Sequence, residues 1–363
     1  MTIPSPLDRG TYPAAQARAY GGEPRGAERF PGDADHGRAA DGSGEERGRD
    51  ARAAAGPAAE LGPGRAVLAF DVGGTDIKSA LFDETGAALG LRRTPTPPPG
   101  PDLPERLIAR LLDLAAQLRA EHPDVEPAAV GLVVPGIVDE ESGIGVFASN
   151  MGWRNAPIRA LAEAAFGLPV AFGHDVGGGG LAEHELGGAR GYDDVVVLII
   201  GTGIAGVLLL DGRIHTAGGF AGEIGHSPVA DEPVCACGAR GCLEAIASAG
   251  AIARRYTERS GSPVDGAKEV IARAAAGDRI AAQVWDEALH ALTLSIAQLT
   301  AVLAPQAVVI GGGLSRAGGA LFDELRARLE ARLSFHRIPD LVPAQLRGNA
   351  GILGAALRAR SLE

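Results

Sequence analysis

The stretch Val67-Leu-Ala-Phe-Asp71-Val-Gly-Gly-Thr75-Asp-Ile-Lys78 is where the chain first shows a regular pattern. An apolar run ends in an aspartate, two glycines turn the chain, and a second apolar run continues to Phe82. Short apolar runs bounded by turn residues are typical of buried strands, so we predict a strand, a tight turn and a strand. Val195–Ile200, the turn Gly201-Thr-Gly203 and the run Val207–Leu210 repeat this order.

A third apolar run, Ala307–Ile310, ends in Gly311-Gly312-Gly313. Apolar residues at helical spacing lie between the strand-like runs, most clearly over 103–118 and 279–304. Strands that alternate with helices predict an α/β fold. Because the strand–glycine–strand unit occurs twice, we predict two related α/β domains that flank a cleft.

Residues 1–64 differ in composition from the rest of the chain. They are rich in Gly, Ala, Pro, Arg and Asp and contain few β-branched or aromatic residues. Such a segment buries too little apolar surface to offset the entropy lost on ordering, so we predict a disordered extension. No helix-turn-helix pattern is visible in it.

The overall charge and hydropathy exclude several functional classes. The net charge is −11 at pH 7, without the basic stripe that a nucleic-acid surface requires. The N-terminus shows no signal peptide. The longest uncharged apolar run, Val195–Leu210, is too short for a membrane span and contains the glycine turn. We therefore predict a cytoplasmic protein that binds neither nucleic acid nor membrane.

All three cysteines of the chain, Cys235, Cys237 and Cys242, fall within eight positions, and His226 stands nine positions upstream. Three thiolates and one imidazole make the complete ligand set of a structural zinc site. The alternative is a group of unbound core cysteines, since free cysteine is often buried. The glycine-rich surroundings and the lack of other cysteines favour zinc.

Two carboxylates flank this metal cluster. Glu223 precedes His226, and Glu244 follows Cys242. A metal ion that fixes the loop also fixes these two side chains.

The glycine turns raise the question of nucleotide binding. The chain has no Walker-type phosphate loop. Gly201-Thr-Gly203-Ile-Ala-Gly206 matches the dinucleotide pattern, which requires a following helix, but Val207–Leu210 indicates a strand. A dinucleotide site is therefore rejected.

A strand–glycine turn–strand can still bind phosphate, because glycine lets backbone N–H groups approach the oxygens. Asp71 is a candidate Mg²⁺ ligand, and Thr75 and Thr202 would add hydroxyl donors. Lys78 has the charge to meet a phosphate, although it also suits a solvated surface. Each turn alone also fits an ordinary hairpin.

Asp175 is the candidate general base. It follows a short strand and precedes a glycine run, where a carboxylate can face a cleft and accept a proton from an attacking hydroxyl. A helix cap is the alternative role for Asp175. Asn150 has an amide that suits a sugar hydroxyl or an ordinary turn.

Together these residues resemble the ROK family (repressors, open reading frames and sugar kinases) of the actin-like ATPase superfamily. The similarity runs from about residue 66 to the end and is carried by these segments: Asp71-Val-Gly-Gly-Thr75-Asp-Ile-Lys78, Val134-Pro-Gly-Ile-Val-Asp139, Asn150–Trp153, Asp175, Gly201-Thr-Gly203, Gly222-Glu-Ile-Gly-His226, Cys235–Glu244 and Ile310–Gly313.

The resemblance implies two actin-like ATPase (ribonuclease H-like) domains and an ATP:hexose phosphotransferase that requires Mg²⁺ and a structural Zn²⁺. We assign the domains to 65–184, completed by a C-terminal helix at 345–363, and to 185–344. The expected assembly is a homodimer or homotetramer.

The family pattern implies a role for each matched residue. Asp175 is the expected catalytic base. The expected sugar ligands are Asn150, Asp175, Glu223, His226 and Glu244. The expected nucleotide and Mg²⁺ contacts are Asp71, Gly73, Gly74, Thr75, Lys78, Gly201, Thr202, Gly203, Gly311, Gly312 and Gly313. The expected zinc ligands are His226, Cys235, Cys237 and Cys242.

Glucose, phosphorylated to glucose 6-phosphate, is the expected substrate. The first alternative is a kinase of N-acetylglucosamine or N-acetylmannosamine. A sugar-responsive transcriptional regulator is the second, disfavoured because no helix-turn-helix is visible before residue 66.

One departure from the family lies beside the base. Many family kinases have Asn-Asp-Ala-Asn there, whereas this chain has His174-Asp175-Val176-Gly177 followed by three more glycines. Glycine costs about 1 kcal/mol relative to alanine in a helix. We therefore predict that the following helix starts late, near Leu181. His174 could tune Asp175 or simply pack, and we favour packing.

Overall fold

The computed structural model describes residues 61–100 and 102–362, which belong to one compact unit. The predicted extension lies outside the described residues except for its last four positions. Leu61 is buried, and the Gly64 N–H donates to the carbonyl oxygen of Glu84 at 2.9 Å. The packed part of the chain therefore includes residues that we had assigned to the extension.

The first sheet has the strand order β3-β2-β1-β4-β8. Its β1–β2 and β2–β3 pairs are antiparallel, and its β1–β4 and β4–β8 pairs are parallel. The strands are β1 Val67–Val72, β2 Asp76–Phe82, β3 Ala88–Pro95, β4 Ala129–Val134 and β8 Val170–His174. The predicted strand, glycine turn and strand at Val67–Phe82 are thus confirmed.

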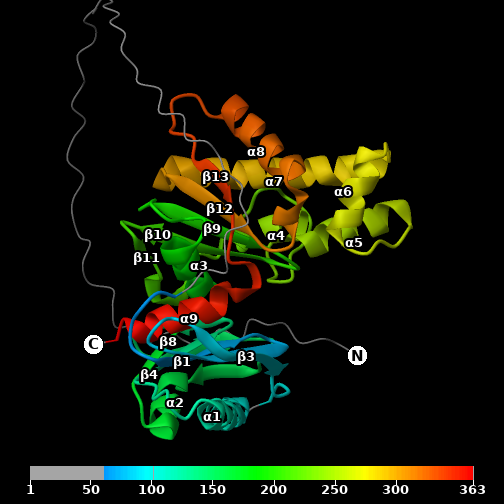
Figure 1. Cartoon of the computed structure of the whole chain (residues 1–363). Helices are drawn as coiled ribbons and strands as arrows, with labels where there is room; N and C mark the ends of the chain where they lie inside the picture. The colour runs from blue at the N-terminus through cyan, green and yellow to red at the C-terminus, as the bar shows by residue number, and fades with distance from the viewer. Residues whose placement is uncertain (1–60, 101, 363) are drawn as a thin grey trace, which may run out of the picture. The chain divides into compact units, whose positions relative to one another are not determined.

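Helices cover both faces of this sheet (Figure 1). Leu68 and Phe70 of β1 pack with helices α1 Leu103–Glu121 and α2 Ile158–Phe166. Val67 and Ala69 pack on the opposite face with α9 Ala350–Arg360, as expected because alternate strand residues face opposite sides. A small antiparallel sheet, β5 Ile137–Asp139, β6 Ile144–Ala148 and β7 Trp153–Ala156, follows β4.

The second sheet repeats the topology of the first, with the order β11-β10-β9-β12-β13. The β10 pairs with β9 and β11 are antiparallel, and the β12 pairs with β9 and β13 are parallel. The strands are β9 Val195–Ile200, β10 Ile204–Leu210, β11 Arg213–Ile214, β12 Ala307–Gly311 and β13 Asp340–Pro343. The prediction of two α/β domains with duplicated strand units is confirmed.

Most helices of the second domain pack on one face of this sheet. Val196, Leu198 and Ile200 of β9 share a core with them. The helices are α4 Leu243–Ala247, α5 Ala249–Ser260, α6 Ala267–Ala275, α7 Arg279–Leu303 and α8 Gly319–Arg332. Single helical turns are η1 Ala217–Gly219, η2 Ile224–His226 and η3 Leu314–Ala317, and a fourth, η4 Arg347–Asn349, precedes α9. No helix within the described residues is both long and apolar enough to cross a membrane.

The helix after the base starts earlier than we predicted. Helix α3 spans Asp175–Leu186 and includes all four glycines, so the expected start near Leu181 is wrong. A Cβ on Gly354 of α9 would lie 1.9 Å from the carbonyl oxygen of Gly178, and a Cβ on Gly180 would lie 2.9 Å from Val207. The close packing of α3 on α9 and β10 thus requires glycine and outweighs its low helix propensity.

The carboxylate of Glu183 in α3 lies buried between two chain segments that connect the sheets. Its side chain accepts hydrogen bonds from the N–H groups of Gly188 at 2.8 Å, Gln345 at 3.0 Å and Leu346 at 2.8 Å. Gly188 lies on the path from α3 to β9, and Gln345 and Leu346 lie on the path from β13 to α9. One carboxylate therefore ties both connections together.

Substituting Glu183 with alanine is expected to lower the free energy of unfolding by about 3 kcal/mol or more, because three N–H groups lose their acceptor in a site that is 1% exposed. Urea unfolding measures the change. Glu185→Ala is the matched control, since Glu185 lies on the same helix with its side chain 49% exposed. Equal unfolding midpoints for the two variants would contradict this role of Glu183.

Candidate active site and metal centre

Two aspartates lie at the same edge of the first sheet. Asp71 is near the end of β1, and Asp175 directly follows β8. Strands β1, β4 and β8 are parallel, and Asp71 pairs with Val133 while His174 pairs with Val134. Strands β1 and β8 flank β4, and their carboxyl ends point the same way. The side chains of Asp71 and Asp175 therefore lie at neighbouring positions on either side of β4.

Burial and the nearby charge of Asp71 raise the pKa of Asp175 to about 7. The Val176 N–H and the Lys78 ammonium act in the opposite direction. Oδ1 of Asp175 accepts a hydrogen bond from the Val176 N–H at 2.7 Å. Oδ2 has no hydrogen-bond partner among the described residues. The carboxyl group thus has one held oxygen, one available oxygen and a pKa near neutrality, which suits a general base.

Lys78 contacts Asp71 directly. Its Nζ lies 2.9 Å from Oδ2 of Asp71, and the side chains are 21% and 12% exposed. A Cβ on Gly351 would lie 2.5 Å from the same Asp71 oxygen, so the carboxylate lies against the first turn of α9. The ammonium that we expected to meet a phosphate is therefore paired with the expected Mg²⁺ ligand.

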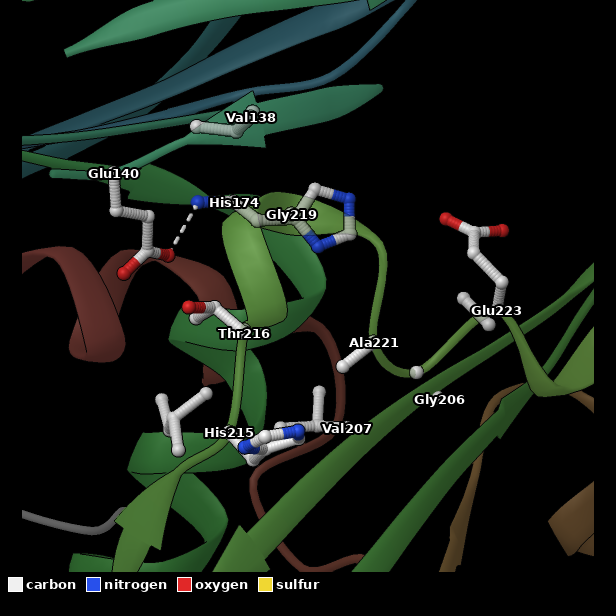
Figure 2. Close-up of a pocket in the computed structure, with 14 residues that line it drawn as sticks. Val138, Glu140, His174, Gly206, Val207, His215, Thr216, Gly219, Ala221 and Glu223 are labelled. Atoms are coloured by element: carbon white, nitrogen blue, oxygen red, sulfur yellow. Dashed lines mark hydrogen bonds between the residues drawn. The ribbon is translucent and has the colours of Figure 1, made fainter. Parts of the chain in front are cut away.

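A pocket opens beside His174, the residue before Asp175 (Figure 2). The first domain lines it with Val138, Glu140, His174 and Gly177, and the second domain with residues 205–207, 214–216, 219 and 221–223. The ring of His174 and the side chain of Glu223 enter the pocket from different domains (Figure 2). Burial lowers the pKa of His174, so the imidazole is neutral at pH 7.

Asn150 and Glu244 lie outside the lining of this pocket, against the two glycine turns. A Cβ on Gly74 would lie 2.7 Å from Nδ2 of Asn150, and one on Gly203 would lie 2.5 Å from Oε2 of Glu244. The same Glu244 oxygen accepts a hydrogen bond from the Ile204 N–H at 2.8 Å. Of the expected sugar ligands, Glu223 and His226 lie close together, with Oε2 of Glu223 4.0 Å from Nε2 of His226. Glu223 also lines the pocket opposite His174, the residue before Asp175.

The four predicted metal ligands form one cluster, with all donor atoms within 4.8 Å of one another. The Sγ atoms of Cys237 and Cys242 are 3.7 Å apart, and Sγ of Cys235 lies 3.7 Å from Nδ1 of His226. Two sulfur ligands of a tetrahedral zinc ion lie about 3.8 Å apart. The cluster therefore fits the zinc site that we predicted.

The buried thiol of Cys242 would need a bound cation to act as a ligand. Burial raises the pKa of the Cys242 thiol to about 12, and the neighbouring Cys237 and Cys235 add to the shift. Such a thiol becomes a thiolate ligand at neutral pH only when a metal compensates its charge. Nδ1 of His226 faces Cys235, and its Nε2 lies 4.0 Å from Oε2 of Glu223. One ring nitrogen can thus bind zinc while the other faces Glu223.

The two glycine turns offer free backbone donors. The N–H of Gly73 donates to the carbonyl oxygen of Asp76, and the N–H of Gly201 donates to the carbonyl oxygen of Gly203. The next two N–H groups in each turn have no acceptor within the described chain. They are those of Gly74 and Thr75 in the first turn and those of Thr202 and Gly203 in the second. Adjacent unpaired N–H groups are suited to phosphate oxygens.

The third glycine turn lies next to the second. Strands β9 and β12 are parallel neighbours, so Gly201–Gly203 and Gly311–Gly313 leave the same edge of the sheet. Gly312 has φ +79°, and a Cβ there would lie 2.3 Å from the Ile200 carbonyl oxygen. Cβ atoms on Gly201 and Gly313 would meet nothing within 4 Å. The edge is therefore open where the two turns meet, which fits a nucleotide.

The chain belongs to the ROK family, whose sequence profile matches residues 67–361. It is similar to a glucokinase of Thermotoga maritima, with 34% identity over 310 residues that cover 80% of this chain and 96% of the relative. An N-acetylmannosamine kinase of Escherichia fergusonii is 35% identical over 301 residues, 81% of this chain and 98% of the relative.

A solved structure of a ROK family glucokinase from Streptomyces griseus, in complex with glucose and AMPPNP, matches the fold with a TM-score of 0.67. Its identity is 29%, over 82% of this chain and 100% of that one. This protein is a sugar kinase of the ROK family, and glucokinases and N-acetylmannosamine kinases match it about equally.

Sequence reasoning missed two residues that hold the chain next to Asp175, the candidate base. Glu140 and Arg358 form a bidentate ion pair with oxygen–nitrogen distances of 2.7 and 2.9 Å. Both are partly buried, and Oε1 of Glu140 also accepts a hydrogen bond from the His174 N–H at 3.1 Å. The partners are 218 positions apart, so no local pattern could have shown the pairing.

Proposed function

We propose that this protein transfers the γ-phosphoryl group of ATP to a hexose, most readily to the 6-hydroxyl of glucose. The observation that carries the proposal is Asp175, whose pKa is raised to about 7 and whose Oδ2 is available beside the pocket. A base with a pKa near neutrality accepts the hydroxyl proton most effectively at physiological pH.

The sugar site in this proposal consists of Asn150, Asp175, Glu223, His226 and Glu244. Asp175 accepts the proton of the attacking hydroxyl, and the other side chains hold the remaining hydroxyls. The pocket lined by both His174, which precedes Asp175, and Glu223 supports the grouping of Asp175 with Glu223. Hydrogen bonds that orient the sugar keep the attacking oxygen in line with the phosphorus.

The nucleotide site in this proposal uses the glycine turns. The unpaired N–H groups at Gly74, Thr75, Thr202 and Gly203 hold phosphate oxygens, and Gly311–Gly313 lie near the adenosine. Asp71 holds Mg²⁺, with Lys78 released from Asp71 to a phosphate. Bound Mg²⁺ supplies the charge that neutralises the transferred group.

The zinc centre in this proposal positions residues and contacts no reacting atom. Glu223 precedes η2, which carries the ligand His226, and Glu244 lies in the first turn of α4, directly after Cys242. Zinc held through Nδ1 of His226 leaves Nε2 for a sugar hydroxyl, an arrangement in which each nitrogen fixes the role of the other.

We also propose the domain division 65–184 and 185–344, with 345–363 completing the first domain. The packing of α9 on β1 and α3 supports it. In this division the two connecting segments that Glu183 holds are the hinge, and closure would exclude water as a competing phosphoryl acceptor.

An N-acetylmannosamine kinase is the second candidate, because a kinase with that specificity is 35% identical. A coupled-enzyme assay of ADP release with glucose, mannose, N-acetylglucosamine and N-acetylmannosamine separates the candidates. We expect kcat/KM for glucose to exceed that for either amino sugar by about tenfold or more. A higher kcat/KM for an amino sugar would contradict the glucose assignment, and the reaction without sugar is the control.

A further inference from the structure

The residue before the base contacts it. Nε2 of His174 lies 3.2 Å from Oδ1 of Asp175, the same oxygen that accepts the Val176 N–H. The His174 side chain is 30% exposed and faces the pocket. His174 therefore borders both the base and the space next to it.

The backbone of His174 is fixed by the Glu140–Arg358 ion pair. Glu140 accepts from the His174 N–H, and Arg358 reaches Glu140 from α9 with both terminal nitrogens. The side chains of Glu140 and Arg358 are 19% and 14% exposed, so solvent screens the pair only in part. Glu140, directly after β5, and Arg358 of α9 thus meet at His174, the last residue of β8. Figure 2 shows the hydrogen bond between His174 and Glu140.

The two glycines around His174 show how closely this pair is packed. A Cβ on Gly173 would lie 2.8 Å from Arg358 and 2.9 Å from Glu140, and one on Gly177 would lie 3.3 Å from Arg358. The chain before and after the base is therefore in contact with the ion pair. The backbone that carries the His174 ring is therefore held in place beside Asp175.

We propose that His174 is a positioning residue for Asp175: its Nε2–H engages Oδ1 and leaves Oδ2 as the oxygen that receives the substrate proton. This inference rests on the proposed role of Asp175 as the base. Loss of the imidazole frees the carboxylate to rotate, so that either oxygen can face the hydroxyl in a poor geometry. Small errors in the placement of reacting groups lower kcat strongly.

The role of the ring follows from its neutral state. A neutral imidazole has one N–H donor and one acceptor nitrogen, and a carboxylate oxygen only accepts. With the proton on Nε2, the ring can donate to Asp175 and present Nδ1 to the pocket. An asparagine side chain also offers an N–H donor, whereas alanine offers none.

The test compares His174→Ala, His174→Asn and His290→Ala with the parent protein, using the sugar that the parent phosphorylates best. His290 is the control because it is exposed on α7 and lies outside the lining of this pocket. We expect His174→Ala to lower kcat by about ten- to one-hundredfold with KM changed less than about threefold. His174→Asn should recover most of the lost kcat, and His290→Ala should leave kcat unchanged.

A kcat for His174→Ala within twofold of the parent overturns the proposal. A rise in KM at unchanged kcat also overturns it, because it identifies His174 as a sugar contact only. If His174→Ala does not fold, as judged by its melting temperature, His174→Gln replaces it, and failure of both Asn and Gln to retain kcat overturns the proposal. A parent protein that phosphorylates no sugar overturns the proposed function, and this inference with it.

Discussion

Asp175→Asn is expected to lower kcat for sugar phosphorylation by a factor of about one hundred to ten thousand, the usual contribution of a general base. The amide keeps the size and most contacts of the carboxyl group but cannot accept the hydroxyl proton. Sugar binding, measured by calorimetry with the nonreacting variant, should change little. Asp113→Asn, on the exposed side of α1, is the matched control and should retain the parent kcat.

The pH dependence of kcat/KM for the parent protein is a second test of the role of Asp175. Since the pKa of Asp175 is raised to about 7, the base is protonated below that value and kcat/KM should fall as the pH decreases through 7. An aspartate near its usual pKa of 3.8 would leave the rate flat down to about pH 5. Substantial turnover by Asp175→Asn, or a flat profile to pH 5, would remove Asp175 from the role of base.

Cys242→Ala is expected to abolish zinc binding and to lower kcat/KM for the sugar by about tenfold to one hundredfold or more. Cys242 is fully buried, and its loss leaves three ligands in a site that requires four. Because Glu223 and Glu244 flank the loop, both lose their fixed positions. Metal analysis should give about one zinc per chain for the parent and close to none for the variant.

Arg240→Ala is the control for the cysteine substitution. Arg240 lies in the same loop and pairs with Glu232, and both side chains are more than 60% exposed. Zinc content and kinetics of this variant should match the parent, because exposed ion pairs contribute about 0–1 kcal/mol. A zinc-free preparation that keeps full activity and stability would contradict the positioning role of the metal.

Local sequence patterns were sufficient where the structure depends on near neighbours. Apolar runs that end in glycine predicted the strands of both sheets, and the spacing of Cys235, Cys237 and Cys242 predicted the metal cluster. These features use contacts within a few positions of the chain.

Features that depend on packing between distant segments were not predictable. The start of α3 was wrong because glycine propensity is a local preference, whereas contact with Gly354 of α9 is tertiary. The bonds from Glu183 to Gln345 and from Glu140 to Arg358 span 162 and 218 positions. Neither carboxylate differs in sequence from an ordinary surface residue, so only the fold reveals its role.

Phosphorus NMR of the parent protein incubated with ATP, Mg²⁺ and glucose tests the central claim most directly. Our account predicts that ADP and a phosphomonoester on the 6-oxygen of glucose form together, and that Asp175→Asn forms neither at a comparable rate. The appearance of inorganic phosphate without sugar phosphate, or the persistence of ATP with every hexose, would contradict it.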